Sequence, residues 1–509
     1  MIITMTIVLN SNKEENMKNS VKSFFMAIGV IALAAISCNK ESADMADSKF
    51  DKHTCEMRLV GSLSEFDDIK TKSGSDASEW KHGSIIYLRM DSPLGITTGE
   101  AVYNSSTDVW TISYYGSLYE GAAQSCSALY LEDKVSYESS IFTMNESTII
   151  YEDLEGSYMF EEGDLVVTAN LKPKTGRIRF SGDPGKVLKI YGVTYYTTYD
   201  INNDQHTTSS EPFKITVGED GQTPYFYGYF TDTKEPNIKV WIDAKEAYTR
   251  YFSNDVFNQG QSGKLTIPTA NEYNGWAEGL YFSVNKEKFK MIAVEGGKFL
   301  MGDPESTSES AIPHNVTLTG YCIAETEMTE KLYSNLFGSN VGTLKPKQVY
   351  YSGVSTIIEN MISQTHAQFC LPSEAQWEFA ARGGKYTKGF KYAGGNDVQK
   401  VAWYSDNSDG QVHDVKTLLP NELGLYDMSG NSMEFVLDYY NPYPDEDVTD
   451  PVSEYIDINS HVTRGGDCTF DDTYCITTQR FSNRSWNSYA NGYYNNYYHA
   501  AIRLCLNWK

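Results

Sequence analysis

Residues 371–384 read LPSEAQWEFAARGG and carry clear signals for both ends of a helix. Ser373 stands at the N-cap position, and Gln376 three residues later completes a capping box. The pair Gly383 and Gly384 follows the predicted last turn, where glycine is a common terminator. The stretch therefore predicts one short helix with well-defined ends.

Four further blocks surround this helix. The first is a strand, a tight turn and a strand, and the second is a strand followed by the start of a helix. Two glycine-containing segments come after the predicted helix. In chain order the blocks occupy residues 291–302, 313–319 with 327–333, 421–435 and 462–466. Helices, strands and glycine pairs in one segment predict an α+β domain, placed at residues 285–509.

The segment Ser485–Tyr498 reads SWNSYANGYYNNYY, which is not the composition of a protein core. Five of its fourteen residues are Tyr and four are Asn. Rigid amphipathic rings beside small hydrogen-bonding residues are typical of binding surfaces. A low-complexity, aggregation-prone tract is the alternative. The flanking motifs Arg464–Gly466 and Ala501–Leu504 favour a displayed binding surface.

Length and charge narrow the classes of protein that this chain can represent. A chain of 509 residues is too long for one core and predicts two to four domains. The net charge of −25 predicts an acidic surface that repels phosphate backbones, so nucleic acid is not an expected partner. The 38 Tyr residues, against 22 Phe, favour a β-rich architecture.

An N-terminal segment predicts a lipid anchor. Lys18 and Lys22 form a positive region before the 13-residue apolar run Phe24–Ile36, which is too short to span a bilayer. The segment resembles a bacterial lipoprotein signal, with cleavage before Cys38 and acylation of Cys38. Residues 1–38 would then be an upstream extension plus signal peptide, and the mature protein a surface-exposed lipoprotein, expected in the outer membrane. An ordinary secretory signal is the alternative.

Seven cysteines remain besides Cys38. They are Cys55, Cys126, Cys322, Cys370, Cys468, Cys475 and Cys505. Their spacing contains no CxxC motif, so a structural zinc site has no support. An odd number leaves at least one thiol free, and the pairing stays open.

The region between the signal and residue 276 is predicted to be β-structured. A polar tether at 39–76 precedes short apolar or alternating segments at 77–276, separated by turn-forming residues. This pattern predicts one or two antiparallel β-sandwiches, with a split near residue 168. The layout of residues 71–90 and 263–276 resembles the fimbrillin-like domains of bacterial surface lipoproteins, which implies a stalk or assembly role.

The five blocks of the C-terminal part, taken in order from Lys288 to Leu504, resemble the formylglycine-generating enzyme (sulfatase-modifying factor) family. The resemblance implies a C-type-lectin-like fold with little regular secondary structure. The predicted fold class is therefore mixed: an all-β antiparallel sandwich region followed by an α+β C-type-lectin-like domain. That fold carries both oxidases and binding proteins, so it does not decide the function.

The oxidases of this family hold copper through two cysteines five residues apart, because soft thiolates suit Cu(I). Here the second position is Cys475, but the first is Phe470, which cannot bind a metal. Cys468 lies two residues too early. A thiol nucleophile would need a nearby base, and His461 and His499 are the local candidates. We therefore predict no catalytic residues and no copper, with Cys475 the single family cysteine retained.

The resemblance also implies a structural calcium ion at the block DMSGNSME. Asp427 and Glu434 would contribute carboxylates, and Gly430 and Ser432 would contribute backbone carbonyls. Hard oxygen ligands around a glycine-containing turn suit Ca²⁺. A solvated acidic loop is the alternative.

Within the same superfamily, the chain resembles variable proteins of diversity-generating retroelements, whose C-terminal stretch is varied at the adenines of Asn codons. Asp467–Thr478 and the Tyr/Asn tract look like the product of such variation. The predicted ligand-binding residues are Asp467, Cys468, Phe470, Asp472, Tyr474, Asn483, Trp486, Asn487, Tyr489, Asn491, Tyr493 and Tyr494.

Three functions compete. The leading one is a membrane-anchored lipoprotein that binds an unknown protein or glycan through its Tyr/Asn/Ser-rich C-terminal surface. The second is a formylglycine-generating or related metal oxidase, and the missing thiolate at Phe470 counts against it. The third is a fimbrial or adhesin subunit, which rests on the N-terminal region alone.

Overall fold

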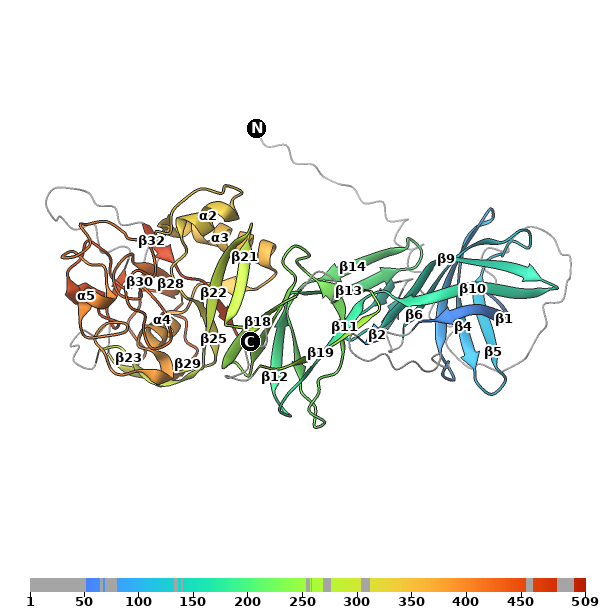
Figure 1. Ribbon diagram of the computed structural model, residues 1–509, viewed down its shortest axis with the longest axis horizontal. Helices are drawn as coiled ribbons and strands as arrows, with labels where there is room; N and C mark the ends of the chain where they lie inside the picture. The colour runs from blue at the N-terminus through green and yellow to red at the C-terminus, as the bar shows by residue number, and fades with distance from the viewer. Residues whose placement is uncertain are drawn as a thin grey trace, which may run out of the picture. The chain divides into compact units, whose positions relative to one another are not determined.

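The computed structural model describes most of the chain from residue 52 onward (Figure 1). The described residues are 52–64, 67–68, 80–131, 136–138, 141–252, 257, 259–268, 276–303, 312–454, 461–482 and 499–509. The predicted signal peptide with Cys38 lies outside them. The described residues form two compact units, one of those within 52–61, 80–128 and 154–169, the other of those within 62–79, 129–153 and 170–509.

The first unit is built on a closed β-barrel. Its order is β1 (Lys52–Leu63), β10 (Asp164–Pro173), β9 (Ile150–Glu161), β6 (Gln124–Leu131), β3 (Ile85–Ser92), β4 (Gly95–Asn104) and β5 (Val109–Tyr115). Alternation fixes the register, since Ile86, Leu88 and Met90 of β3 are fully buried between half-buried neighbours. The mixed, β-rich fold class is confirmed. In this unit, however, β1 pairs with β5, so the sheet closes into a barrel instead of forming a sandwich.

Two sheets enclose the core of the first part of the second unit. One has the order β2 (Asp67–Asp68), β19 (Gln261–Thr266), β11 (Gly176–Ser181), β16 (Phe226–Phe230), β13 (Val193–Asp200), β8 (Ile141–Thr143) and β7 (Ser136–Glu138), with β14 (Gln205–Ser209) beside β13. The other has the order β15 (Phe213–Thr216), β12 (Val187–Tyr191), β17 (Asn237–Ile242), β18 (Glu246–Tyr251) and β20 (Trp276–Glu278). Phe180, Phe226 and Val240 meet in the core between them.

Three small sheets and short helices make up the C-terminal part. The sheets have the orders β21 (Leu280–Val284), β22 (Glu287–Val294), β25 (Tyr321–Ala324), β33 (Cys505–Asn507), β27 (Phe369–Cys370); β23 (Gly297–Met301), β24 (His314–Leu318), β29 (Val448–Thr449); and β26 (Val349–Tyr350), β32 (His499–Ile502), β28 (Glu434–Tyr439), β30 (His461–Arg464), β31 (Arg480–Ser482). The α-helices are α2 (Glu330–Leu336), α3 (Val354–Thr365), α4 (Glu374–Ala381) and α5 (Val398–Val401).

Helix α4 matches the sequence-based prediction. The Ser373 hydroxyl accepts from the Gln376 amide at 3.1 Å, and the Gln376 side chain accepts from the Ser373 amide at 2.9 Å. All eight helix residues are buried. Gly383 ends the segment with a φ of +87°, and a Cβ there would lie 2.7 Å from Glu422 Oε2. Local capping therefore fixes a helix whose whole surface is covered by other segments.

The sheet that contains β25 and β33 separates two hydrophobic cores. Cys322 and Leu506 belong to one core, together with Leu280, whereas Ile323 and Cys505 belong to the other, which surrounds Trp377. Alternation along the strands explains this division, since successive side chains point to opposite faces. The first core also includes Tyr191 and Trp241 from β12 and β17, and the Trp241 ring meets Trp508 edge-on at 5.0 Å.

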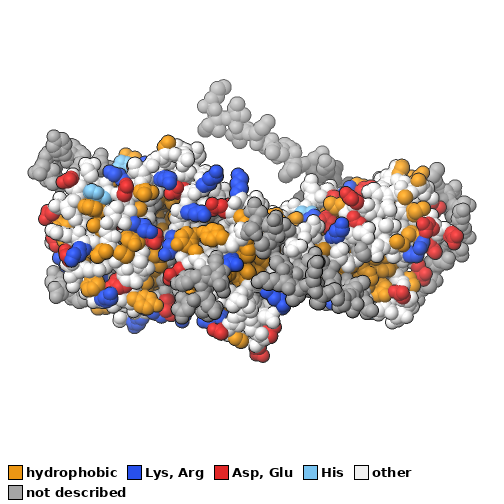
Figure 2. All heavy atoms as spheres, viewed as in Figure 1, with side chains coloured by type: hydrophobic (Ala, Val, Ile, Leu, Met, Phe, Trp, Pro, Cys, Tyr) orange, Lys and Arg blue, Asp and Glu red, His pale blue; other side chains and the backbone are white. Residues whose placement is uncertain are grey.

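The surface drawn in Figure 2 carries both signs of charge, with Lys and Arg side chains interspersed among Asp and Glu. Among the residues that the structure describes, none of the helices combines the length and apolar character needed to cross a membrane.

Candidate functional site

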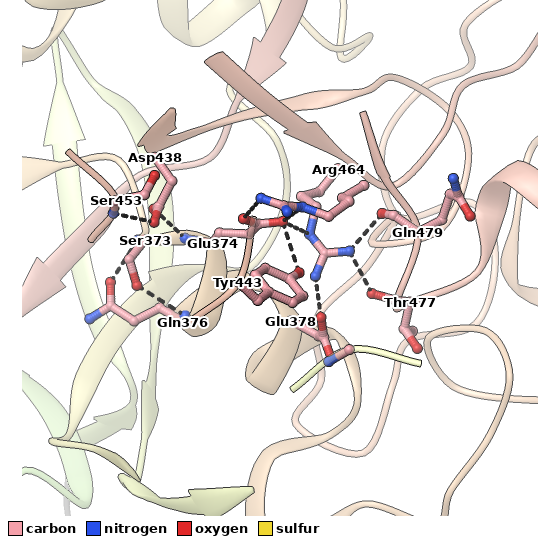
Figure 3. A network of polar contacts seen from close by, with 12 residues as sticks. Ser373, Glu374, Gln376, Glu378, Asp438, Tyr443, Ser453, Arg464, Thr477 and Gln479 are labelled. Atoms are coloured by element: carbon pink, nitrogen blue, oxygen red, sulfur yellow. Dashed lines mark hydrogen bonds and ion pairs between the residues drawn. The ribbon is translucent and has the colours of Figure 1, made fainter. Parts of the chain in front are cut away.

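Arg464, the last residue of β30, anchors both ends of the loop formed by residues 465–479. Its side chain is fully buried, and its Nη1 donates to the carbonyl oxygens of Thr477 at 3.2 Å and Gln479 at 2.6 Å. Its Nη2 donates to the Glu378 carboxylate of α4 (Figure 3). One side chain therefore holds the point where the chain leaves the sheet and the point to which it returns.

Arg480, the first residue of β31, extends this network beyond the loop. Its Nε and Nη2 contact the two carboxylate oxygens of Glu374 at 2.8 and 2.7 Å, which is a bidentate pair. Glu374 also accepts from the Tyr443 hydroxyl at 3.2 Å and pairs with Arg464 Nε at 3.3 Å. Buried charges need such partners, because an unpaired one would cost several kcal/mol.

Asp438 on β28 supports the beginning of α4. Its Oδ2 accepts from the Glu374 amide at 2.7 Å, and its Oδ1 accepts from the Ser453 amide at 2.8 Å (Figure 3). Burial raises the pKa of Asp438 to about 7. Asp438 thus fixes the beginning of α4, the helix whose Glu374 and Glu378 carboxylates hold Arg480 and Arg464.

Arg503 forms a second buried ion pair behind the loop. Its Nη2 lies 2.6 Å from Glu434 Oε1, and its Nε lies 3.0 Å from Glu434 Oε2. Glu434 also accepts from Trp377 Nε1 at 2.7 Å. Glu327 stands 3.7 Å from Arg503 Nη2, and burial, with the nearby Asp427 carboxyl, raises the pKa of Glu327 well above its usual value.

Two of the predicted ligand-binding residues, Asp467 and Cys468, are buried in this structure. Asp467 accepts from the Thr469 amide at 2.7 Å and from its hydroxyl at 2.6 Å, and burial raises the pKa of Asp467. The Cys468 amide donates to the Asn431 carbonyl at 3.2 Å. Asp467 therefore stabilises the first turn of the loop from within, and Cys468 ties that turn to Asn431.

Three other predicted residues lie closer to solvent. Phe470 and Tyr474 are half-buried and stack with Phe481, with ring centroids 5.1 to 6.1 Å apart. Asp472 is half exposed, accepts from the Tyr392 hydroxyl at 2.6 Å and pairs with Lys391 at 3.4 Å. Residues 469–474 therefore present stacked rings and acidic side chains together, and we name them the aromatic loop.

The remaining predicted contacts fall between Ser482 of β31 and His499 of β32. They are Asn483, Trp486, Asn487, Tyr489, Asn491, Tyr493 and Tyr494, and all seven lie outside the described residues.

A pocket that the sequence did not reveal lies beside His499. It has a volume of about 450 Å³, and its lining includes Tyr333, Phe337, Lys347, Tyr350 and His499. The rings of Tyr350 and His499 lie 3.7 Å apart, and Lys347 Nζ lies 5.0 Å from the centre of the Tyr333 ring. The neighbouring aromatic residues Tyr350 and Tyr351 were a weak signal, because the contact of Tyr350 with His499 depends on the pairing of β26 with β32.

The two carboxylates predicted to hold calcium have other partners in this structure. Both carboxylate oxygens of Glu434 already contact Arg503 and Trp377. Asp427 accepts from the Lys416 amide at 2.9 Å, and burial raises the pKa of Asp427 to about 6. Among the described residues, no His, Cys, Asp and Glu side chains form a metal-binding group of three.

The cysteines of the loop are not activated thiols. Burial raises the pKa of Cys475 to about 12 and that of Cys468 to about 11, so both keep their protons at neutral pH. Burial also lowers the pKa of His461 to about 4, and its ring stacks on Tyr351 at 3.4 Å. Phe470, at the position of the family's first cysteine, packs its ring against Tyr474 and Phe481.

Comparisons with known proteins agree with the C-terminal resemblance. Residues 348–492 match the family model described as the sulfatase-modifying factor enzyme 1-like domain. The chain is 26% identical to the chaperone protein LppX of Paenibacillus barcinonensis, over 30% of this chain and 72% of that protein. It is 32% identical to a formylglycine-generating enzyme of Streptomyces coelicolor, over 23% of this chain and 41% of that protein, so it spans less than half of that enzyme. Among solved structures, variable protein 1 of Treponema denticola matches with 22% identity and a TM-score of 0.39, over 45% of this chain and 98% of that one.

Proposed function

We propose that this chain, which carries a sulfatase-modifying factor enzyme 1-like domain in its C-terminal part, uses that domain as a scaffold for ligand binding. The observation that carries the proposal is the aromatic loop, which lies within the segment 465–479 whose two ends are anchored by the fully buried Arg464. We further propose, from the sequence of residues 17–38 alone, that the protein is a lipid-anchored protein of the cell surface.

Anchoring matters for binding because ordering a flexible loop costs free energy on association. Phe470 and Tyr474 are already held in a stack with Phe481, so their ring faces have few conformations to lose. Rigid rings of this kind supply contact area at low entropic cost. Asp471 and Asp472 add negative charge beside the rings, which favours a ligand with basic or hydroxyl groups.

The expected ligand is a surface protein or a glycan. The Tyr/Asn tract at 485–498 would extend the binding face, and its composition is the reason for proposing diversification by a retroelement. Sequencing the locus in sibling strains tests the proposed diversification by a retroelement. Differences concentrated at adenines in the codons of residues 467–499 support it, whereas an invariant stretch or changes at other bases refute it.

The binding experiment uses the full chain in detergent, applied to arrays of glycans and of proteins. The variant Phe470→Ser/Tyr474→Ser removes both rings of the aromatic loop. The control variant Tyr386→Ser removes a 64% exposed ring elsewhere in the same domain. We expect the loop variant to lose about tenfold or more in affinity for whichever ligand binds, and the control to lose none. Equal binding by all three proteins would overturn the proposal.

A further inference from the structure

Cys370 and Cys505 lie directly opposite each other on neighbouring strands. The antiparallel register of β27 and β33 pairs Phe369 with Leu506 and Cys370 with Cys505. Residues that are directly opposite in an antiparallel pair have Cα atoms about 4.5 to 5.5 Å apart. A disulfide needs Cα atoms about 4.4 to 6.8 Å apart, so the backbone requires no movement to allow one.

The two side chains also share one face of the sheet. Cys505 belongs to the core around Trp377, and Cys370 packs against that same core. The Cys370 thiol lies 3.6 Å from the Cys505 carbonyl oxygen, and the Asn507 amide nitrogen lies 3.5 Å from the Cys370 sulfur. The sulfur of Cys370 is therefore directed along β33, towards its partner.

Cys322 is excluded as a competing partner, although its strand is the other neighbour of β33. The register of β25 places Cys322 opposite Leu506, one residue beyond Cys505. Its side chain consequently points to the opposite face, where it lies with Leu506 in the other core.

We propose that Cys370 and Cys505 are a cross-strand redox pair, a dithiol under reducing conditions and a disulfide under oxidising ones. The oxidant is a small disulfide such as oxidised glutathione. The Cys370 thiolate attacks one glutathione sulfur and releases one glutathione thiolate. The Cys505 thiolate then attacks the Cys370 sulfur of the mixed disulfide and releases the second. The two thiol protons pass to the two released thiolates, so two protein thiols are oxidised while one glutathione disulfide is reduced.

The two sulfurs differ in a way that fixes the order of attack. Cys370 is partly exposed, whereas Cys505 is fully buried. Hydrogen bonds from the Cys505 side chain, and from Asn507, lower the pKa of Cys370, while burial raises the pKa of Cys505. Cys370 is therefore the sulfur that meets the oxidant, and Cys505 is the one that resolves the mixed disulfide.

The disulfide would join two segments that are 135 residues apart in sequence. One of them, Cys370 with Leu371 and Pro372, leads into the capped start of α4, whose glutamates hold Arg464 and Arg480. The other follows Arg503 by two residues. Oxidation would thus link the supports of the aromatic loop without touching the loop itself.

The test uses the full chain, equilibrated with oxidised and reduced glutathione in set ratios, quenched in acid, alkylated and digested with trypsin. Mass spectrometry then searches for the peptide 348–382 joined to 504–509. We expect this joined peptide to dominate under oxidising conditions and to vanish under reducing ones. The joined peptide should also form in the variant Cys322→Ala, which lacks the competing thiol. The proposal would be overturned if Cys370 and Cys505 were both found alkylated, and so unlinked, under oxidising conditions. Linkage of either peptide to residues 299–331, which contain Cys322, would also overturn it.

A second measurement tests the order of attack. In Cys505→Ala, Cys370 should accumulate as a mixed disulfide with glutathione, whereas in Cys370→Ala the buried Cys505 should stay reduced. The opposite pattern contradicts the assigned roles. Oxidation should also raise the melting temperature of the natural chain by several degrees and leave that of Cys370→Ala unchanged.

Discussion

Arg503 Nη2 lies 2.6 Å from Glu434 Oε1 in a pair that is completely buried. The resemblance to the formylglycine-generating enzyme family implies that the same Glu434 carboxylate binds calcium. Here the charge opposite that carboxylate is a guanidinium of the chain itself. The guanidinium therefore balances the charge of that carboxylate.

Chelation should consequently leave the domain intact. We expect the melting temperature of the full chain to change by less than about 1 °C when EDTA is added in excess, because Glu434 keeps its partners. Differential scanning calorimetry with and without EDTA, followed by added calcium, checks this. A fall that calcium reverses would mean that Glu434 exchanges Arg503 for the ion.

Removal of Arg503 should be costly. In Arg503→Met, Glu434 would be left as a buried charge beside the carboxyls of Asp427 and Glu327, and we expect a loss of about 3–5 kcal/mol in the free energy of unfolding. Urea denaturation measures the loss. The control is Lys298→Ala, which breaks an exposed pair with Asp447 and should leave the free energy of unfolding almost unchanged. Equal losses in the two variants would contradict the assigned role of burial.

The stability of the domain should depend on pH through Asp427. Burial raises its pKa from 3.8 to about 6, so between these values the native carboxyl keeps a proton that the unfolded chain has lost. The contribution of this group to stability is therefore present at low pH and falls as pH rises from about 4 to about 6, by at most about 1.4 kcal/mol per pH unit. The urea midpoint of the natural chain should therefore fall, relative to that of Asp427→Asn, as pH rises across this window. Parallel curves for the two proteins would refute the shift.

Formylglycine synthesis should not occur. The resemblance to the formylglycine-generating enzyme family implies that Phe470 replaces the first copper-binding cysteine of the oxidases. Burial holds the thiols of Cys468 and Cys475 protonated. We expect no aldehyde when the chain is incubated with copper and a Cys-x-Pro-x-Arg peptide, while a formylglycine-generating enzyme in the same assay produces it. Aldehyde formation by this chain would replace the binding proposal with the oxidase alternative.

The parts of the structure that follow from local sequence were predictable. Ser373 and Gln376 cap α4 through contacts within three residues, and the alternation in β3 follows from residues two apart. Closure of the barrel was not predictable, since it depends on the pairing of β1 with β5, which lie about fifty residues apart.

The candidate site was predicted in part for the same reason. The composition of residues 467–478 marked the loop, but the burial of Asp467 and Cys468 depends on Asn431 and on other distant contacts. The ion pairs of Arg503 with Glu434 and of Arg480 with Glu374 join residues 69 and 106 positions apart, and no short motif specifies such partners.

The anchor at Arg464 has a consequence for how this protein can evolve. Its hydrogen bonds at the far end of the loop go to the carbonyl oxygens of Thr477 and Gln479. Main-chain oxygens are present whatever side chain stands at those positions. Mutations along the aromatic loop can therefore alter what it recognises while the arginine keeps its acceptors, so that the specificity of the surface and the integrity of the domain can be selected separately.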